Sequence, residues 1–131
     1  RLHLHHNQSA ALSFDWKFNR NLVADSRLEN NGSQGVFMRD SVENQFRNLT
    51  IQNNGQQGIF IAQSDSLPDT ACVKNSFTKL TVTANKGHGL RINDATCTGN
   101  VGSGSRFANN SQGDISQTSD DLLAVSDPSG G

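Results

Sequence analysis

The residues of this sequence best suited to chemistry are its four histidines, three of which lie near the start of the chain. Imidazole groups serve as metal ligands and as acid–base groups. If His3, His5 and His6 belong to a strand, alternation turns His3 and His5 to the same outward face, but no cysteine or carboxylate follows them closely. His88 lies alone in a glycine-rich turn, without an evident acid or base partner. We therefore predict no catalytic residue and no confident metal site.

Several aspartates form a second group of chemically useful residues. Carboxylate and carbonyl oxygens are the ligands that Ca²⁺ prefers. No EF-hand-like spacing appears, so solvated loop charges are the simpler interpretation. We predict no cofactor, and calcium is the alternative. The weak calcium candidates are Asp40, Asp65, Asp69 and Asp94.

The composition narrows the class of protein. The chain has 131 residues, of which 33% are hydrophobic and 6% aromatic, which is lean for one ordinary globular domain. Only 18% are charged and the net charge is −1, so no basic surface for nucleic acid is expected. No apolar run approaches the roughly 20 residues of a membrane span, and the first residues lack the apolar core of a signal peptide. We expect a processed protein without a membrane span.

A repeated segment determines the fold prediction. The segment 49–61, LTIQNNGQQGIFI, recurs in altered form at 26–38 and 80–92, and more faintly at 2–14 and around 107–115. Each copy has two short bursts of alternating apolar residues separated by Asn and Gly, which predicts strand, turn, strand. One such unit buries too little apolar surface alone, but stacked units form parallel sheets around a continuous core.

One asparagine recurs at the same place in every copy. Successive positions differ by 24, 23, 31 and 25 residues by subtraction. An inward amide at a tight turn can hydrogen-bond to the equivalent amide of the coils above and below. The predicted asparagine ladder is Asn7, Asn31, Asn54, Asn85 and Asn110.

This pattern resembles the right-handed single-stranded parallel β-helix superfamily typified by pectate lyases. The resemblance implies an all-β solenoid of about five coils over residues 2–117, followed by a C-terminal strand and tail over 118–131. Leucine-rich repeats have a similar period, but their leucine consensus is absent. The superfamily also implies polysaccharide lyase, hydrolase or epimerase chemistry, for which we find no compact set of basic and acidic residues on adjacent coils.

The longest repeat spacing places a loop insertion after the third coil, within 63–76. Cys72 lies in this loop, and Cys97 follows the second strand of the next coil, at the same corner. We therefore predict a disulfide between Cys72 and Cys97, which indicates an oxidising compartment and contributes about 3 kcal/mol.

Alternation also defines an outward face. Phe37 and Phe60 are expected to stack in one outward column that continues to Arg91, with Arg39 beside them. Exposed aromatic rings can stack on sugars or be covered by another part of the protein. These four residues are the candidates for carbohydrate binding or for an interface. Of the four glycosylation sequons, only Asn48 is expected to be accessible, whereas Asn7 and Asn31 point inward.

The ends of a β-helix expose unpaired strand edges, and no cap is evident in this sequence. The expected partners are therefore other copies stacked end to end, or adjoining coils of a longer chain, and a polysaccharide is a further alternative. We predict a noncatalytic extracellular or cell-surface module, structural and self-assembling or carbohydrate-associated, with a periplasmic location as an option. The alternative function is a fragment of an enzyme that acts on acidic glycans.

Overall fold

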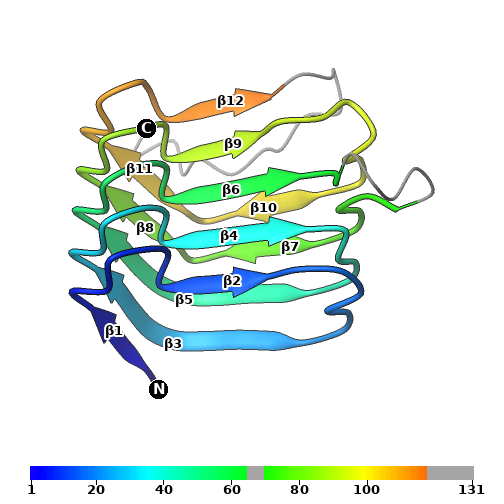
Figure 1. Cartoon of the computed structure of the whole chain (residues 1–131), viewed down its shortest axis with the longest axis horizontal. Helices are drawn as coiled ribbons and strands as arrows, with labels where there is room; N and C mark the ends of the chain where they lie inside the picture. Colours follow the sequence, from blue (N-terminus) through cyan, green and yellow to red (C-terminus); the bar gives the residue numbers. More distant parts are fainter. Residues whose placement is uncertain (65–69, 118–131) are drawn as a thin grey trace.

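The computed structural model describes residues 1–64 and 70–117, which form a parallel β-solenoid (Figure 1). The described residues contain strands and no helix, so none of them provides a helix that could cross a membrane. The chain makes about four complete turns, and the all-β parallel prediction is confirmed. The strands of the larger sheet, sheet A, are β1 (His3–His5), β3 (Leu22–Glu29), β5 (Gln45–Gln52), β7 (Ser76–Thr78), β8 (Thr81–Thr83), β10 (Val101–Ser103) and β11 (Arg106–Ala108). The strands of sheet B are β2 (Leu12–Phe14), β4 (Val36–Arg39), β6 (Ile59–Ala62), β9 (Leu90–Ile92) and β12 (Ile115–Gln117).

The strand register follows the sequence repeat. In sheet B, Val36 of β4 aligns with Leu12 of β2 and with Ile59 of β6, and Ile59 aligns with Leu90 of β9. The residues at alternate positions point inward and form one continuous apolar column, so a lean composition suffices for a core. The largest fully buried side chains are Phe46, Phe77, Phe107, Leu28, Met38, Leu49, Ile51, Ile59, Ile61, Leu80, Leu90 and Ile92.

Sheet A bends within each coil, which the expectation of two strands per coil did not include. The bend falls at Asp25, Asn48, Lys79 and Gly104, which all have positive φ angles between 53° and 63°. The left-handed conformation turns the chain without breaking the stack, because it recurs at the same place in each coil. As a result, β3 and β5 each run through the bend, whereas β7 and β8 are separate strands, as are β10 and β11.

The predicted asparagine ladder is present. The backbone N–H and the side-chain amide of each rung donate to the Oδ1 atom of the next rung at 2.9–3.1 Å. Asn31, Asn54, Asn85 and Asn110 are all buried. Asn7 is exposed, contrary to the expectation that its sequon is inaccessible, because it lies on the first rung of the described stack. Asn48 is exposed, as expected.

A second asparagine ladder lies at another corner and was not predicted. The N–H groups of Asn21, Asn44 and Asn75 each donate to the next asparagine Oδ1 at 2.9–3.1 Å, and the ladder ends at Asn100. Each asparagine of both ladders follows a residue with positive φ, for example His6 before Asn7 and Glu43 before Asn44. One local rule therefore makes two corners of every coil: a left-handed residue turns the chain inward, and the asparagine amide then pairs with the adjacent coils.

The loop insertion falls where the sequence predicts it. The connection from β6 to β7 spans 63–75, whereas the equivalent connections before and after it span 40–44 and 93–100.

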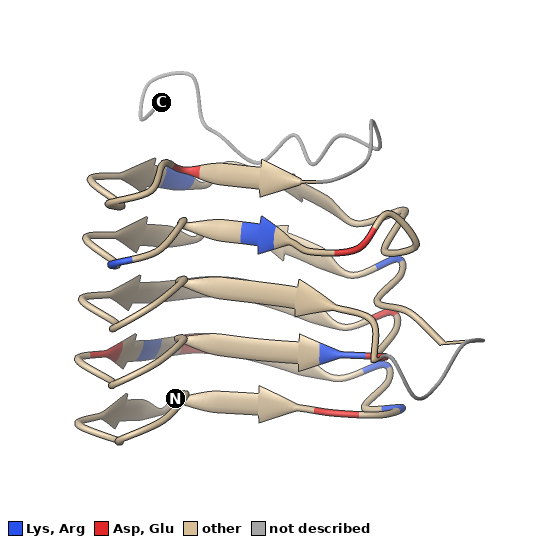
Figure 2. Cartoon of the chain, turned by 45° about the horizontal axis from the view of Figure 1, so that its top comes forward, with Lys and Arg blue, Asp and Glu red and all other residues tan. Residues whose placement is uncertain are grey.

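Adjacent coils pack so closely at some turns that only glycine fits there. A Cβ atom on Gly58 would lie 2.6 Å from the carbonyl oxygen of Gly89 in the next coil. Charged residues are sparse on the described surface, and many lie on turns rather than on strands (Figure 2).

Candidate metal site

The three N-terminal histidines lie on the first rung of sheet A, where β1 pairs with β3. His3 and His5 point outward and are exposed, whereas Leu4 between them is partly buried against the core. The rings of His3 and His5 therefore lie on the same face, with centroids 4.4 Å apart. The period-2 alternation of a strand gathers these two imidazoles, as the sequence predicts.

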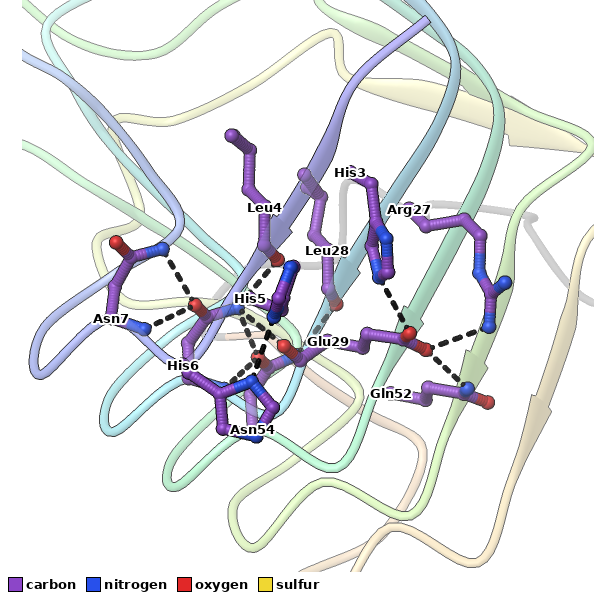
Figure 3. Close-up of polar contacts among 11 residues, drawn as sticks. His3, Leu4, His5, His6, Asn7, Arg27, Leu28, Glu29, Gln52 and Asn54 are labelled. Carbon is purple, nitrogen blue, oxygen red and sulfur yellow. Dashed lines mark hydrogen bonds and ion pairs between the residues drawn. The ribbon is translucent and has the colours of Figure 1, made fainter.

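His6 joins the same cluster through its backbone conformation. Successive residues of a strand point to opposite faces, so His5 and His6 would normally diverge. His6 has a φ of 57°, which ends β1 and begins the turn into Asn7. The Nδ1 atoms of His5 and His6 consequently lie 2.7 Å apart. Figure 3 shows the two rings side by side at the start of the turn. The turn that the asparagine ladder requires also brings two imidazoles together.

The separation of these two nitrogens suits a shared metal ion. An imidazole nitrogen bonds to a metal at about 2.0 Å, so two ligands at a right angle lie about 2.8 Å apart. In the metal-free protein one Nδ1 must carry a proton and donate it to the other. The ring centroids are 5.0 Å apart, so the two nitrogens point at each other, and both rings would have to turn before a metal ion could replace that hydrogen bond.

Glu29 holds the third imidazole of this group, which we call the histidine cluster (His3, His5 and His6). Its Oε1 atom lies 2.7 Å from Nε2 of His3. Oε2 accepts hydrogen bonds from Arg27 at 3.0 Å and Gln52 at 2.7 Å. A carboxylate bound to one nitrogen of a histidine orients the ring and leaves the other nitrogen available to a metal. For His3 the available nitrogen is Nδ1.

Hydrogen bonding stabilises the charged form of Glu29. The amide of Gln52 is the main cause that lowers the pKa of this carboxyl group, with smaller contributions from His3 and Arg27, whereas burial opposes the shift. Glu29 is therefore a carboxylate at neutral pH, although only 7% of the residue is exposed. Its negative charge favours a cation near His3.

Sequence reasoning found the histidines but missed this carboxylate. Glu29 follows His3 by 26 residues, and only the repeat alignment, which places β1 beside β3, brings the two together. The expectation that the cluster lacks a carboxylate partner is therefore wrong. Within residues 1–64 and 70–117, no three or more His, Cys, Asp or Glu side chains are grouped so that they could hold a metal ion together. The cluster thus offers two close nitrogens, and any further ligands must come from outside this pair.

The outward column on sheet B has the predicted register. Phe37 aligns with Phe60, and Phe60 with Arg91. The two rings are stacked, with centroids 5.5 Å apart, and Arg39 lies 5.3 Å from the centroid of Phe37. Arg39 also forms an ion pair with Asp15. The column is therefore ordered by its own contacts, and both phenylalanines remain partly exposed.

The predicted disulfide is not present. Cys72 and Cys97 are both free thiols, although they lie at the same corner as expected. Both are buried in the core. The Cys72 thiol lies within hydrogen-bond distance of the carbonyl oxygens of Ala62, at 3.5 Å, and Met38, at 3.6 Å. The neighbouring Cys97, together with burial, raises the pKa of Cys72, whereas Cys72 lowers the pKa of Cys97. The thiols are neighbours held by hydrogen bonding and packing, not by a covalent bond.

The weak calcium candidates do not form a shared site in the described part of the chain. Asp40 accepts a hydrogen bond from the Ser64 amide at 3.0 Å, and Asp94 accepts one from the Gln63 amide at 2.7 Å. Asp65 and Asp69 lie outside the described residues. The Nδ1 atom of His88 is buried and has no hydrogen-bond partner among the described residues.

A comparison with protein families relates most of this chain to a known family. Residues 4–123 match the family described as "Periplasmic copper-binding protein (NosD)", whose domain is a parallel β-helix of the pectate-lyase-like type. The match covers His5, His6 and the cysteine pair, whereas His3 lies just before it. No curated protein and no solved structure gives a significant match.

Proposed function

We propose, from the premise that this chain belongs to the NosD family, that it is a noncatalytic periplasmic β-helix module that binds copper. The observation that carries this proposal is the pair of facing imidazole nitrogens of His5 and His6, 2.7 Å apart, on the exposed edge of the solenoid. Imidazole is a suitable ligand for copper. The separation of the two nitrogens and the donor type both fit the family's metal.

Each residue of the site has a distinct task in this proposal. His5 and His6 supply two nitrogens from one rigid turn. His3 adds an imidazole whose Nε2 is held by Glu29, and Arg27 and Gln52 fix the carboxylate in turn. Copper bound here remains accessible, because all three histidines are exposed. An accessible site suits a module that receives a metal ion and passes it on.

Copper titration of purified variants tests the proposal. The α-amine should be acetylated so that it cannot join His3 as a ligand, and affinity should be measured by competition with a chelator. We expect the double substitution His5→Ala/His6→Ala to abolish binding at this site. Glu29→Gln should weaken it about tenfold, because a supporting carboxylate typically contributes 10- to 100-fold to metal affinity.

His88→Ala is the matched control, since His88 lies on another coil. Nitrogen hyperfine structure in the electron paramagnetic resonance spectrum of the Cu²⁺ form should disappear in the double variant and persist in the control. Copper binding that is unaffected by the double substitution would refute the assignment to these histidines. A protein that binds no copper at all would refute the function.

A second candidate function, stacking with further coils, is favoured by the polarity of the asparagine ladders. At the first rung, no donor from the described residues reaches Oδ1 of Asn7. Asn110 is the last rung of the described ladder, and no Oδ1 atom of residues 1–64 and 70–117 accepts from its backbone N–H. The two ends are thus complementary, and exposed Leu2, Trp16 and Leu22 add apolar surface at the first. Light scattering over a range of concentrations tests this candidate: self-association should grow with concentration, and a constant monomer mass would refute it.

A further inference from the structure

A cleft opens at the corner where sheet B leads into sheet A, away from the corner that holds the histidine cluster. It has a volume of about 420 Å³, which lies within the usual range of small-molecule sites. Its wall comes from four successive connections between the sheets, the first after β2 and the last after β9. The wall combines the apolar side chains of Val42, Ala71 and Val73 with the charged side chains of Lys17 and Asp40.

Asp40 contributes a buried carboxylate to this wall. The residue is 2% exposed and directly follows β4. One of its carboxylate oxygens, Oδ1, accepts a hydrogen bond from the Ser64 amide at 3.0 Å. The other, Oδ2, is buried and has no hydrogen-bond partner among the described residues. A buried carboxylate oxygen without a donor is unfavourable, so this atom favours a cationic donor that enters the cleft.

The cations near this carboxylate are engaged elsewhere. Lys17 lines the cleft, and its backbone N–H donates to the carbonyl oxygen of Asp40 at 2.8 Å. Its ammonium group, however, lies over the ring of Trp16, 5.2 Å from the centroid. Arg39, which precedes Asp40, pairs with Asp15. Within residues 1–64 and 70–117, no ion pair includes Asp40, so its charge is left for a cation from outside these residues.

A second carboxylate adds negative charge at the same corner. Asp94 accepts a hydrogen bond from the Gln63 amide at 2.7 Å, and Gln63 precedes Ser64, whose amide donates to Asp40. The two carboxylates therefore approach one coil from the coils on its two sides. The hydroxyl group of Thr96 donates to Oε1 of Gln63 at 2.6 Å, so these two wall side chains are paired with each other. Two like charges so placed attract a cation more strongly than one.

We propose that this cleft binds a small organic molecule with a primary ammonium group, which donates a hydrogen bond to Oδ2 of Asp40. An ammonium group supplies both the positive charge and the N–H donor that this oxygen lacks. Because Oδ2 is buried, the carboxylate must turn toward the opening to meet the ligand.

The rest of the wall selects the kind of molecule that carries the ammonium group. Val42, Ala71 and Val73 offer apolar contacts, so a short apolar group attached to the nitrogen fits the cleft. A metal ion fits less well: Ca²⁺ takes about six to eight oxygen ligands, and no three His, Cys, Asp or Glu side chains of the described residues are grouped to hold a metal. The site contains no histidine of the cluster, so this inference is independent of the proposed copper binding.

Titration of the purified protein with n-butylamine and with benzylamine tests this proposal, and n-butanol is the uncharged counterpart. The backbone amide signals are followed by NMR at neutral pH, where alkylamines, like lysine, are protonated. EDTA is present so that no metal ion mediates binding. We expect saturable shifts of the amide signals of Val42, Ser64 and Val73 with both amines, and none with n-butanol.

Three variants locate the ammonium group. Asp40→Asn should weaken amine binding about ten- to a hundredfold, because it removes a hydrogen bond between charged groups. Asp25→Asn is the matched control: it removes the same charge from an exposed position outside the cleft and should leave the affinity unchanged. Lys17→Met removes a positive charge from the lining and should raise the affinity. Without amine, Asp40→Asn should raise the melting temperature, because it removes a buried charge that lacks a partner, whereas a purely structural carboxylate predicts a decrease.

Each contrary outcome overturns the proposal. Equal shifts with n-butanol and n-butylamine would show apolar binding alone. Full amine affinity in Asp40→Asn, or reduced affinity in Lys17→Met, would place the ammonium group elsewhere. If Ca²⁺, titrated without EDTA, shifts the same signals and excludes the amines, the cleft is a metal site instead. If neither amine gives saturable shifts, the proposal falls. The titration of the unsubstituted protein needs no variant to fold, and none of these outcomes bears on copper binding at the histidine cluster.

Discussion

Removal of one ladder amide should strongly destabilise the fold. Asn54 is 1% exposed, and its side chain makes four hydrogen bonds within the described structure. Its Oδ1 atom accepts from the backbone and the side chain of Asn31, and its Nδ2 atom donates to the Leu28 carbonyl and to Asn85. Asn54→Ala leaves two buried backbone groups, the Asn31 N–H and the Leu28 carbonyl, without these partners.

The expected cost follows from these two orphaned groups. A buried polar group without a partner costs about 1–3 kcal/mol, so we expect a loss of about 3–5 kcal/mol in the free energy of unfolding. Such a loss is a large share of the roughly 5–15 kcal/mol that stabilises a typical domain. Urea unfolding followed by circular dichroism measures it. Asn93→Ala is the matched control, because Asn93 is exposed, and it should cost less than about 0.5 kcal/mol.

Double substitutions distinguish the ladder from a general effect of losing asparagine. Asn54→Ala and Asn85→Ala both remove the hydrogen bond from Nδ2 of Asn54 to Oδ1 of Asn85, so their combined cost should be smaller than the sum. Asn44 belongs to the other ladder, and Asn44→Ala should add to Asn54→Ala. If Asn54→Ala costs no more than Asn93→Ala, the ladder sets the register of the coils without stabilising them, and the reasoning is refuted.

Three further predictions concern packing, pH and the outward aromatic column. Gly58→Ala should lower the free energy of unfolding by about 1–3 kcal/mol, because the new Cβ meets the Gly89 carbonyl 2.6 Å away; a neutral result in urea unfolding would contradict the close packing. The stabilisation from Glu29, whose pKa is lowered, should be complete above its ordinary pKa of about 4.3 and be lost as pH falls through the lowered value. Glu29→Gln should remove that part of the acid dependence in unfolding measurements, and an unchanged profile would argue against the Gln52 and His3 contacts. If the aromatic column binds sugars, Phe60→Ala should weaken retention on acidic-glycan arrays without changing the oligomeric state, whereas equal retention of both proteins would exclude that role.

The sequence by itself determined the architecture. The recurring apolar pairs and the asparagine after each first strand identify a parallel solenoid and its register. They also identify its core face and its loop insertion, because each stacked coil needs inward apolar residues and a turn asparagine at the same positions. The second ladder was also within reach, since Asn21, Asn44, Asn75 and Asn100 differ by 23, 31 and 25 residues by subtraction, which matches the later spacings of the first ladder. Each coil therefore carries two repeated asparagines, of which only the first was predicted.

Only the tertiary structure decided what meets at the sites. Glu29 reaches His3 because the first coil stacks on the second, and no local pattern within either strand indicates that contact. The closeness of His5 and His6 depends on the backbone angle of His6, which strand alternation does not provide. The corner shared by Cys72 and Cys97 follows from the repeat, but whether their sulfurs form a bond or remain thiols depends on side-chain geometry in the packed core. Repetition specifies which residues share a column, whereas side-chain and backbone angles decide which atoms come within bonding distance.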